Sequence, residues 1–103
     1  MEQIVFKALA DPTRRAIFER LAAAPQNATE LRQGFGITQP AVSQHLAVLR
    51  EARLLKERRE GRFIRYEVEP DGLLILVNWL AKYRTYWPDR AADLAALLKE
   101  MDQ

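Results

Sequence analysis

The sequence of 103 residues contains no cysteine and only one histidine, His45. Without cysteine there can be no disulfide bond, no thiolate metal site and no cysteine nucleophile. One histidine, with no recognisable pair of carboxylates, leaves no set of groups for catalysis. Zinc or nickel sites need several converging histidines or carboxylates. We therefore expect no enzymatic activity, no metal site and no cofactor.

Long hydrophobic runs are also missing. No apolar stretch approaches the roughly 20 residues that span a membrane, and Met1 leads into no signal peptide. Hydrophobic residues make up 49% of the chain and charged residues 29%, which is typical of a globular protein. The length suits one domain. We expect a cytoplasmic protein with a single domain over residues 1–103.

The net charge of the chain is only +2, but the charge is unevenly distributed. Residues 50–65 hold seven bases and three acids, so this segment carries 7 − 3 = +4 and the remainder carries 2 − 4 = −2. A local basic block on a near-neutral protein indicates one surface for a polyanion.

The stretch from Thr38 to Arg50 predicts a helix with two unlike faces. Thr38 is a good N-cap residue, and Pro40 is tolerated in a first turn. Ser43 and Gln44 lie on a side that carries no charge. That side could contact base edges in a DNA major groove, or it could be an ordinary solvated face. The opposite side is an apolar stripe at helical spacing, made of Val42, Leu46 and Leu49.

Two helices are predicted at the start of the chain. Residues 2–9 form a short helix with more apolar surface than one face requires. A second helix begins with Asp11 as N-cap and Pro12 in the first position, and should stop before Pro25. Arg14 and Arg15 in this helix either contact phosphates or are solvated.

A third helix is predicted over residues 28–33, where Asn27 and Glu30 have the spacing of a capping box. Residues 34–37 form a turn in which Gly34 or Gly36 takes positive φ. Two helices joined by a tight glycine-containing turn, the second polar on its outer side, predict a helix-turn-helix.

A two-stranded hairpin is predicted over residues 54–59 and 62–68, with the turn at Glu60-Gly61. Apolar and charged residues alternate in the second strand, as in a half-buried strand. The arginines either protect an edge strand from aggregation or form a wing that contacts the DNA backbone.

Residues 70–72 are expected to end the hairpin, and residues 73–87 to form a helix that is apolar nearly all round. Such a helix must be covered on all sides, most simply by a second subunit. We therefore expect dimerisation through residues 2–9 and 73–101. After Pro88 the helix is kinked or restarts, with a further apolar stripe made of Leu94, Leu97, Leu98 and Met101.

Four stretches resemble the ArsR/SmtB family of bacterial transcriptional regulators. They are FKALADPTR at 6–14, QPAVSQHL at 39–46, residues 49–54, and residues 58–62 with Tyr66. The resemblance implies a mainly α fold with a small β-hairpin, a winged helix-turn-helix. It also implies a homodimeric repressor that binds operator DNA and is often released by an inducer. A winged-helix module that binds protein instead of DNA is the alternative.

This sequence resembles the branch of the family without the usual metal-binding cysteines, through its pattern of Trp79, Tyr83-Arg84 and Trp87. Residues 30–33 lack the Cys-x-Cys that many members carry, and no histidine follows position 45. Arg53 stands where the family usually has glycine. Trp79, Tyr83 and Trp87 are expected in the core or the dimer interface, with an effector pocket as the alternative. Regulation, if present, would come through an organic inducer of unknown identity near these residues, through a partner protein, or through the level of the protein itself.

The resemblance also implies which residues contact DNA. Ser43 and Gln44 are the expected base contacts, and the wing arginines should hold phosphates or enter the minor groove. His45 is either a phosphate contact or a partly buried residue with its hydrogen bonds satisfied. The full set of expected DNA contacts is Thr38, Gln39, Ser43, Gln44, His45, Arg58, Arg59, Arg62 and Arg65. The expected dimer interface is Ile4, Val5, Leu76, Trp79, Tyr83 and Trp87.

Overall fold

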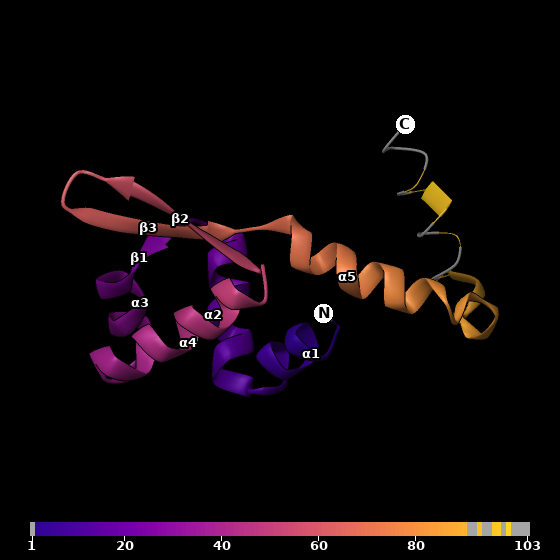
Figure 1. Cartoon of the computed structure of the whole chain (residues 1–103), viewed down its shortest axis with the longest axis horizontal. Coiled ribbons are helices and arrows are strands. Elements are labelled where there is room, and N and C mark those ends of the chain that lie inside the picture. Colours follow the sequence, from indigo (N-terminus) through magenta and orange to yellow (C-terminus); the bar gives the residue numbers. More distant parts are fainter. Residues whose placement is uncertain (1, 91–92, 94–95, 98, 100–103) are drawn as a thin grey trace.

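The computed structural model describes residues 2–90, 93, 96, 97 and 99 (Figure 1). Its elements are α1 (Glu2–Ala10), α2 (Pro12–Ala23), β1 (Gln26–Asn27), α3 (Ala28–Phe35), α4 (Gln39–Glu51), β2 (Leu55–Glu60), β3 (Phe63–Val68), α5 (Pro70–Ala81) and the 3-10 helix η1 (Arg84–Tyr86). The strands form one antiparallel sheet in the order β1-β3-β2. This is the predicted winged helix-turn-helix. No helix in the described ranges has the length and apolar character that crossing a membrane requires.

The predicted N-caps of α2 and α3 are confirmed. Asp11 Oδ1 accepts hydrogen bonds from the amides of Thr13 at 2.8 Å and Arg14 at 3.1 Å. The bond from the Arg14 amide is the main reason that the pKa of the Asp11 carboxyl lies below its ordinary value. The capping box is complete, because the Glu30 amide donates to Asn27 Oδ1 at 2.9 Å and the Asn27 amide donates to Glu30 Oε1 at 3.0 Å.

Arg14 and Arg15 have a structural role that the sequence did not indicate. Arg14 Nε donates to the carbonyl oxygen of Ala8 at 2.7 Å, and Arg14 Nη2 donates to that of Lys7 at 3.2 Å. Arg15 Nη1 donates to the carbonyl oxygen of Leu9 at 3.4 Å. The last carbonyls of a helix have no partners within it. The two arginines therefore cap the end of α1, a role that neither alternative named. Arg15 is exposed, as a solvated residue would be, and Arg14 is half-buried.

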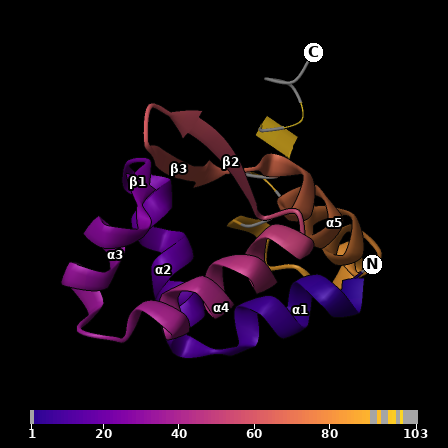
Figure 2. The same cartoon turned by 60° about the vertical axis from the view of Figure 1, so that its left-hand side comes forward.

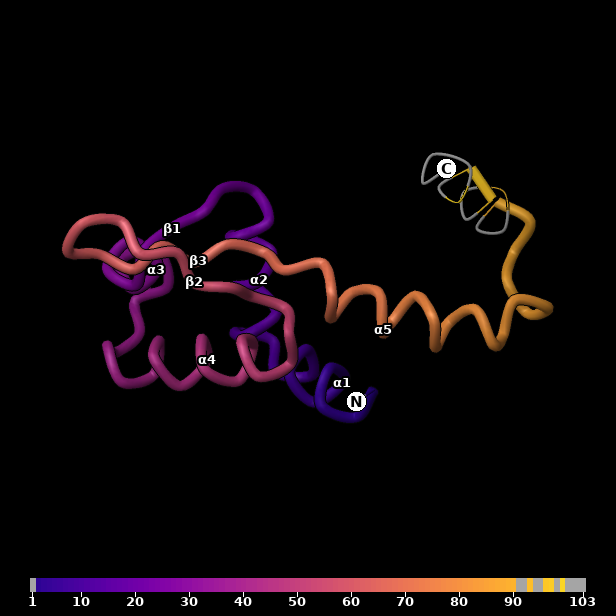
Figure 3. Tube along the Cα trace, turned by 45° about the horizontal axis from the view of Figure 1, so that its top comes forward, coloured from indigo at the N-terminus to yellow at the C-terminus, as the bar shows by residue number. Residues whose placement is uncertain are grey.

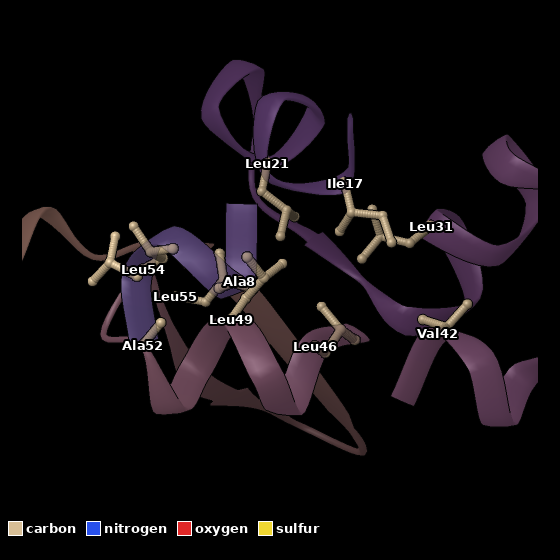
Figure 4. Close-up of a cluster of buried hydrophobic side chains, with 11 residues drawn as sticks. Ala8, Ile17, Leu21, Leu31, Val42, Leu46, Leu49, Ala52, Leu54 and Leu55 are labelled. Atoms are coloured by element: carbon tan, nitrogen blue, oxygen red, sulfur yellow. The ribbon is translucent and has the colours of Figure 1, made fainter. Parts of the chain in front are cut away.

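The hydrophobic core lies between α1–α4 and the base of the hairpin, as the close-up in Figure 4 shows. α1 packs against α2, α4 and α5, and α3 packs against α4 (Figure 2). The buried apolar residues are Val5, Ala8, Ile17, Leu21, Leu31, Val42, Leu46, Leu49, Ala52, Leu54 and Leu55.

The predicted helix over residues 73–87 was wrong at both ends. α5 begins at Pro70, because the Glu69 side chain accepts a hydrogen bond from the Asp71 amide at 3.3 Å and proline suits a first turn. It ends at Ala81, and the separate 3-10 helix η1 follows. Of the stripe expected after Pro88, the residues Leu94, Leu98 and Met101 lie outside the described residues.

The hairpin turn is one residue further along the chain than predicted. Glu60 still pairs with Phe63, so Gly61 and Arg62 form the turn, and Gly61 takes a φ of +61°. Strand β1 was not predicted. It has only two residues, and it forms because Gln26 pairs with Tyr66 and Asn27 with Arg65, far along the chain.

Candidate nucleic-acid interface

α4 turns its apolar stripe to the core and its polar side to solvent. Its first turn is capped by Thr38, whose Oγ1 accepts a hydrogen bond from the Ala41 amide at 3.3 Å. The preceding helix ends at Gly36, whose φ of +63° reverses the chain direction. The predicted stripe is buried at Val42, Leu46 and Leu49. The exposed side carries the predicted residues Thr38, Gln39, Ser43 and Gln44.

His45 differs from the other predicted contacts of α4. It is half-buried, and its Nδ1 atom is buried without a hydrogen-bond partner in the described part of the chain. The pKa of the Asp11 carboxyl is lowered most by the hydrogen bond from the Arg14 amide, and His45 makes a smaller contribution in the same direction. Of the two alternatives for His45, the partial burial matches the partly buried residue, but the Nδ1 atom, which has no partner among the described residues, does not match its satisfied hydrogen bonds. The phosphate contact stays a prediction.

The hairpin of β2 and β3, which we call the wing, extends past the helices at the same end of the molecule as the start of α4 (Figures 1 and 3). In its register Arg58 lies opposite Arg65, and Arg59 lies opposite Ile64. Two like charges directly opposite each other repel. Glu60 lies 2.7 Å from Arg65, and Glu67 lies 4.0 Å from Arg58. These two carboxylates reduce the repulsion.

The four predicted wing arginines are therefore not equivalent. Arg65 is tied to Glu60, and Arg58 shares Glu67 with Lys56. Arg59 and Arg62 are exposed and form no ion pair with any carboxylate that the structure describes. Arg62 lies in the turn itself. The cations that are free for a phosphate are thus at the tip of the wing.

A hollow of about 360 Å³ lies beside the start of α4. It is lined by Thr29, Arg32, Gln33, Gly36 and Ile37. Arg32 adds an exposed cation to the lining of this hollow, and it was not among the predicted contacts. Its signal in the sequence was a lone base on the outer side of the first helix of a helix-turn-helix, the helix that crosses the DNA backbone in such motifs.

A second exposed surface, apolar in character, is shared by α1 and α5. Trp79 lies between Phe6 and Tyr83, with ring centroids 5.0 Å away in both pairs. Of the predicted interface, Ile4 and Tyr83 are exposed, Trp79 and Trp87 are half-buried, and Leu76 packs against the core. Val5 is only 1% exposed and belongs to the core of this chain, which corrects its assignment to an interface surface.

Four further members of this apolar surface lie within the predicted dimerisation segments but were not among the named interface residues. They are Phe6, Leu74, Val77 and Leu80, all exposed. The inner side of α5 is formed by Leu73, Ile75 and Leu76, which pack against the core. The two sides of α5 are equally apolar in sequence, so no periodic signal separates them.

Comparisons with known proteins agree with this geometry. A model of a helix-turn-helix domain matches residues 9–58. The transcriptional repressor SdpR of Bacillus subtilis is 35% identical over 79 residues, which cover 77% of this chain and 88% of SdpR. The HTH-type transcriptional regulator Rv2034 of Mycobacterium tuberculosis is 46% identical over 80 residues, or 78% of this chain and 75% of Rv2034.

A crystal structure of an ArsR family transcriptional regulator matches with a TM-score of 0.74 and 30% identity, over 82% of this chain and 88% of that one. The chain belongs to the ArsR/SmtB family. This ArsR/SmtB-family protein is a DNA-binding transcriptional regulator and not an enzyme. The match to residues 9–58 of this regulator runs from the end of α1 through α4 into β2.

Metal ligands do not gather in the described part of this ArsR/SmtB-family chain. No group of three histidine, cysteine, aspartate or glutamate side chains there could hold a metal ion. The exposed polar side of α4 and the cationic wing tip remain its candidate functional site.

Proposed function

We propose that this regulator is a repressor that binds an inverted-repeat operator as a homodimer. Each α4 lies in a major groove, where Ser43 and Gln44 contact base edges. Arg59 and Arg62 of each wing contact the adjacent phosphates or the minor groove. The observation that supports this most is that the exposed, uncharged polar side of α4 begins at the same end of the molecule as the wing, where Arg59 and Arg62 pair with none of the described carboxylates.

The division of roles follows from the chemistry of the two surfaces. Glutamine and serine can donate and accept hydrogen bonds at base edges, and a face without charge can approach them closely. Arginines supply the electrostatic attraction to phosphates, which carries affinity but no sequence information. The alternative, a winged-helix module that binds protein instead of DNA, is not favoured, because Arg59 and Arg62 make the wing tip cationic and α4 lacks exposed large apolar residues.

The homodimer is supported by the apolar surface of α1 and α5. The side chain of Leu74 is 55% exposed and that of Val77 is 54% exposed. On the same helix, the ring of Trp79 packs edge-to-face against that of Phe6 in α1. Exposed large apolar residues on two helices that pack together support an interaction site there. A two-fold axis through it would place two copies of α4 about one DNA turn apart. The dimerisation segments proposed are residues 2–9 and 73–101 of a single domain.

The decisive experiment is selection of bound DNA from a random pool at a stated salt concentration. We expect an inverted repeat whose half-sites lie about one helical turn apart. In transcription with purified components, the protein should then lower transcript from a promoter that overlaps this repeat. Enrichment of a lone half-site, or of no sequence at all, would contradict the proposal.

Regulation is proposed to act through an organic ligand near Trp79, Tyr83 and Trp87, through a partner protein, or through the level of the regulator itself. The chain has no thiol for soft metals or arsenite. The regulator is proposed to act in the cytoplasm, where its DNA would be.

A further inference from the structure

Arg65 differs from the other three arginines of the wing in its surroundings. It is the one that is not exposed, and its side chain retains 31% of its accessible surface. Its Nε donates to Glu60 Oε2 at 2.7 Å, and its Nη1 donates to the carbonyl oxygen of Pro25 at 3.1 Å. One guanidinium thus joins the far end of β2 to the connection between α2 and α3.

The backbone of Arg65 makes a connection to the same segment. Residue 65 pairs with Asn27 in the sheet, and Asn27 is the N-cap of α3, the first helix of the helix-turn-helix. Side chain and backbone of Arg65 therefore both hold the wing against the start of α3. Glu60 is the last residue of β2 before the turn, so the same guanidinium reaches almost to the wing tip.

These contacts make Arg65 unsuited to bind a phosphate. Its guanidinium is always charged, so leaving Glu60 would uncover a carboxylate close to the DNA. It would also lose its hydrogen bond to the carbonyl oxygen of Pro25. The side chains of Arg59 and Arg62 form no hydrogen bond or ion pair with the residues that the structure describes.

We infer that Arg65 is a positioning residue: it fixes the angle of the wing relative to α3 and α4, so that Arg59 and Arg62 reach the DNA in register with Ser43 and Gln44. This rests on the proposed function, in which the wing and α4 contact one operator. Arg65 itself contacts no phosphate. Its loss should therefore reduce discrimination between sequences more than it reduces general attraction to DNA.

The test measures dissociation constants for the selected DNA and for random DNA over a range of salt concentrations, in the full chain. In R62A the plot of the logarithm of the association constant against the logarithm of the salt concentration should be less steep by about one unit, as for one lost phosphate contact. In R65A the slope should stay as in the wild type. The preference for selected over random DNA should fall about tenfold, comparable to one mismatched base pair.

Lysine variants separate the two roles further. The ammonium group of a lysine can pair with a phosphate as a point charge. It cannot reproduce the planar guanidinium, which donates to Glu60 and to the Pro25 carbonyl oxygen at the same time. R62K should therefore recover part of the affinity lost in R62A, whereas R65K should be as poor in discrimination as R65A. The inference would be overturned if R65K recovered the discrimination between selected and random DNA. It would also be overturned if the salt dependence in R65A became less steep by about one unit.

A measurement without DNA keeps this test separate from the proposed function. Backbone 15N relaxation of residues 58–64 should show greater mobility on the ps–ns timescale in R65A and in E60A than in R62A. Near-identical relaxation in all three variants would refute a positioning role. A wild-type protein that selects no DNA sequence would refute the proposed function, while the relaxation data would still decide whether Arg65 holds the wing.

Discussion

Arg53 adopts a φ of +59°, and its carbonyl oxygen accepts a hydrogen bond from the Gly72 amide at 2.7 Å. This bond ties the end of α4 to the first turn of α5. The next residue, Leu54, adds a second tie, because its carbonyl oxygen accepts from the Glu69 amide at 2.9 Å. The helix proposed to contact DNA is therefore joined directly to the helix proposed to form the dimer.

Replacing Arg53 with glycine should stabilise the protein. Arg53 is the one non-glycine residue in the described ranges with positive φ, a region in which a Cβ costs energy. We expect Arg53→Gly to raise the free energy of unfolding by about 1 kcal/mol, after the entropy cost of glycine in the unfolded chain. Arg53→Ala is the control, since it removes the side chain but keeps the Cβ. A gain in both variants on denaturant unfolding would show that the guanidinium, and not the backbone, is responsible.

Replacing Gly72 with alanine should destabilise the protein. A Cβ at this position would lie 2.7 Å from the carbonyl oxygens of Ala52 and Arg53, and these are backbone atoms that cannot move alone. We expect a loss of about 1–3 kcal/mol in denaturant unfolding.

Gly34→Ala is the matched control for Gly72. Gly34 is also helical, but a Cβ there would meet only the flexible guanidinium of Arg20, which can move aside. Helix propensity then favours alanine. Equal losses in the two variants would show that the close approach at Gly72 does not matter.

The two proposed kinds of DNA contact should respond differently to mutation. Arg59→Ala with Arg62→Ala should weaken binding to all sequences and flatten the salt dependence, by about one unit per lost phosphate contact. Gln44→Ala should cost about 1–3 kcal/mol at particular base positions of the operator. The measurement is a panel of single-base operator variants. A uniform loss over the whole panel for Gln44→Ala would exclude a role in base recognition.

Charge on the outer side of α5 should prevent dimerisation. Val77→Glu and Leu80→Glu each place a carboxylate on the exposed apolar surface, whereas Leu76 packs against the core and its replacement would disturb folding. Sedimentation equilibrium should give a monomer of about 11.9 kDa for the two variants and twice that mass for the wild type.

Ala22→Glu on the exposed side of α2 is the control for the dimer, because it adds the same charge elsewhere. It should sediment as the wild type does. A wild-type protein that is monomeric at micromolar concentration, folded, and still tightly bound to one half-site would exclude the proposed dimer.

Metals should not release this regulator from DNA. The chain has no cysteine, and its single histidine lies on α4. Zinc, nickel, copper and arsenite, each titrated into the protein–DNA complex, should leave the bound fraction unchanged at stoichiometric amounts, in parallel with a sample that contains a chelator. Release by one equivalent of any of them would reveal a site that neither the sequence nor the described residues indicate.

Much of the fold could be predicted because its signals are local. Asp11, Asn27 and Thr38 cap helices through bonds to residues two or three positions away, so their chemistry is visible in a short window of sequence. The apolar stripe of α4 and the alternation in β3 are equally local. The family resemblance, now confirmed, followed from these same segments and from Gln39 to Leu46 in particular.

The sequence by itself thus determined the helix-turn-helix, the hairpin and the polar side of α4. Only the tertiary structure decided which cations are free: Arg14 is used at the end of α1, and Arg65 is held by Pro25, 40 residues earlier. It also decided that Val5 faces inward and which side of α5 stays exposed. The physical reason is that helix and strand periods depend on neighbours in sequence. The partner of a long charged side chain depends on which distant segments of the chain lie beside it in the folded protein.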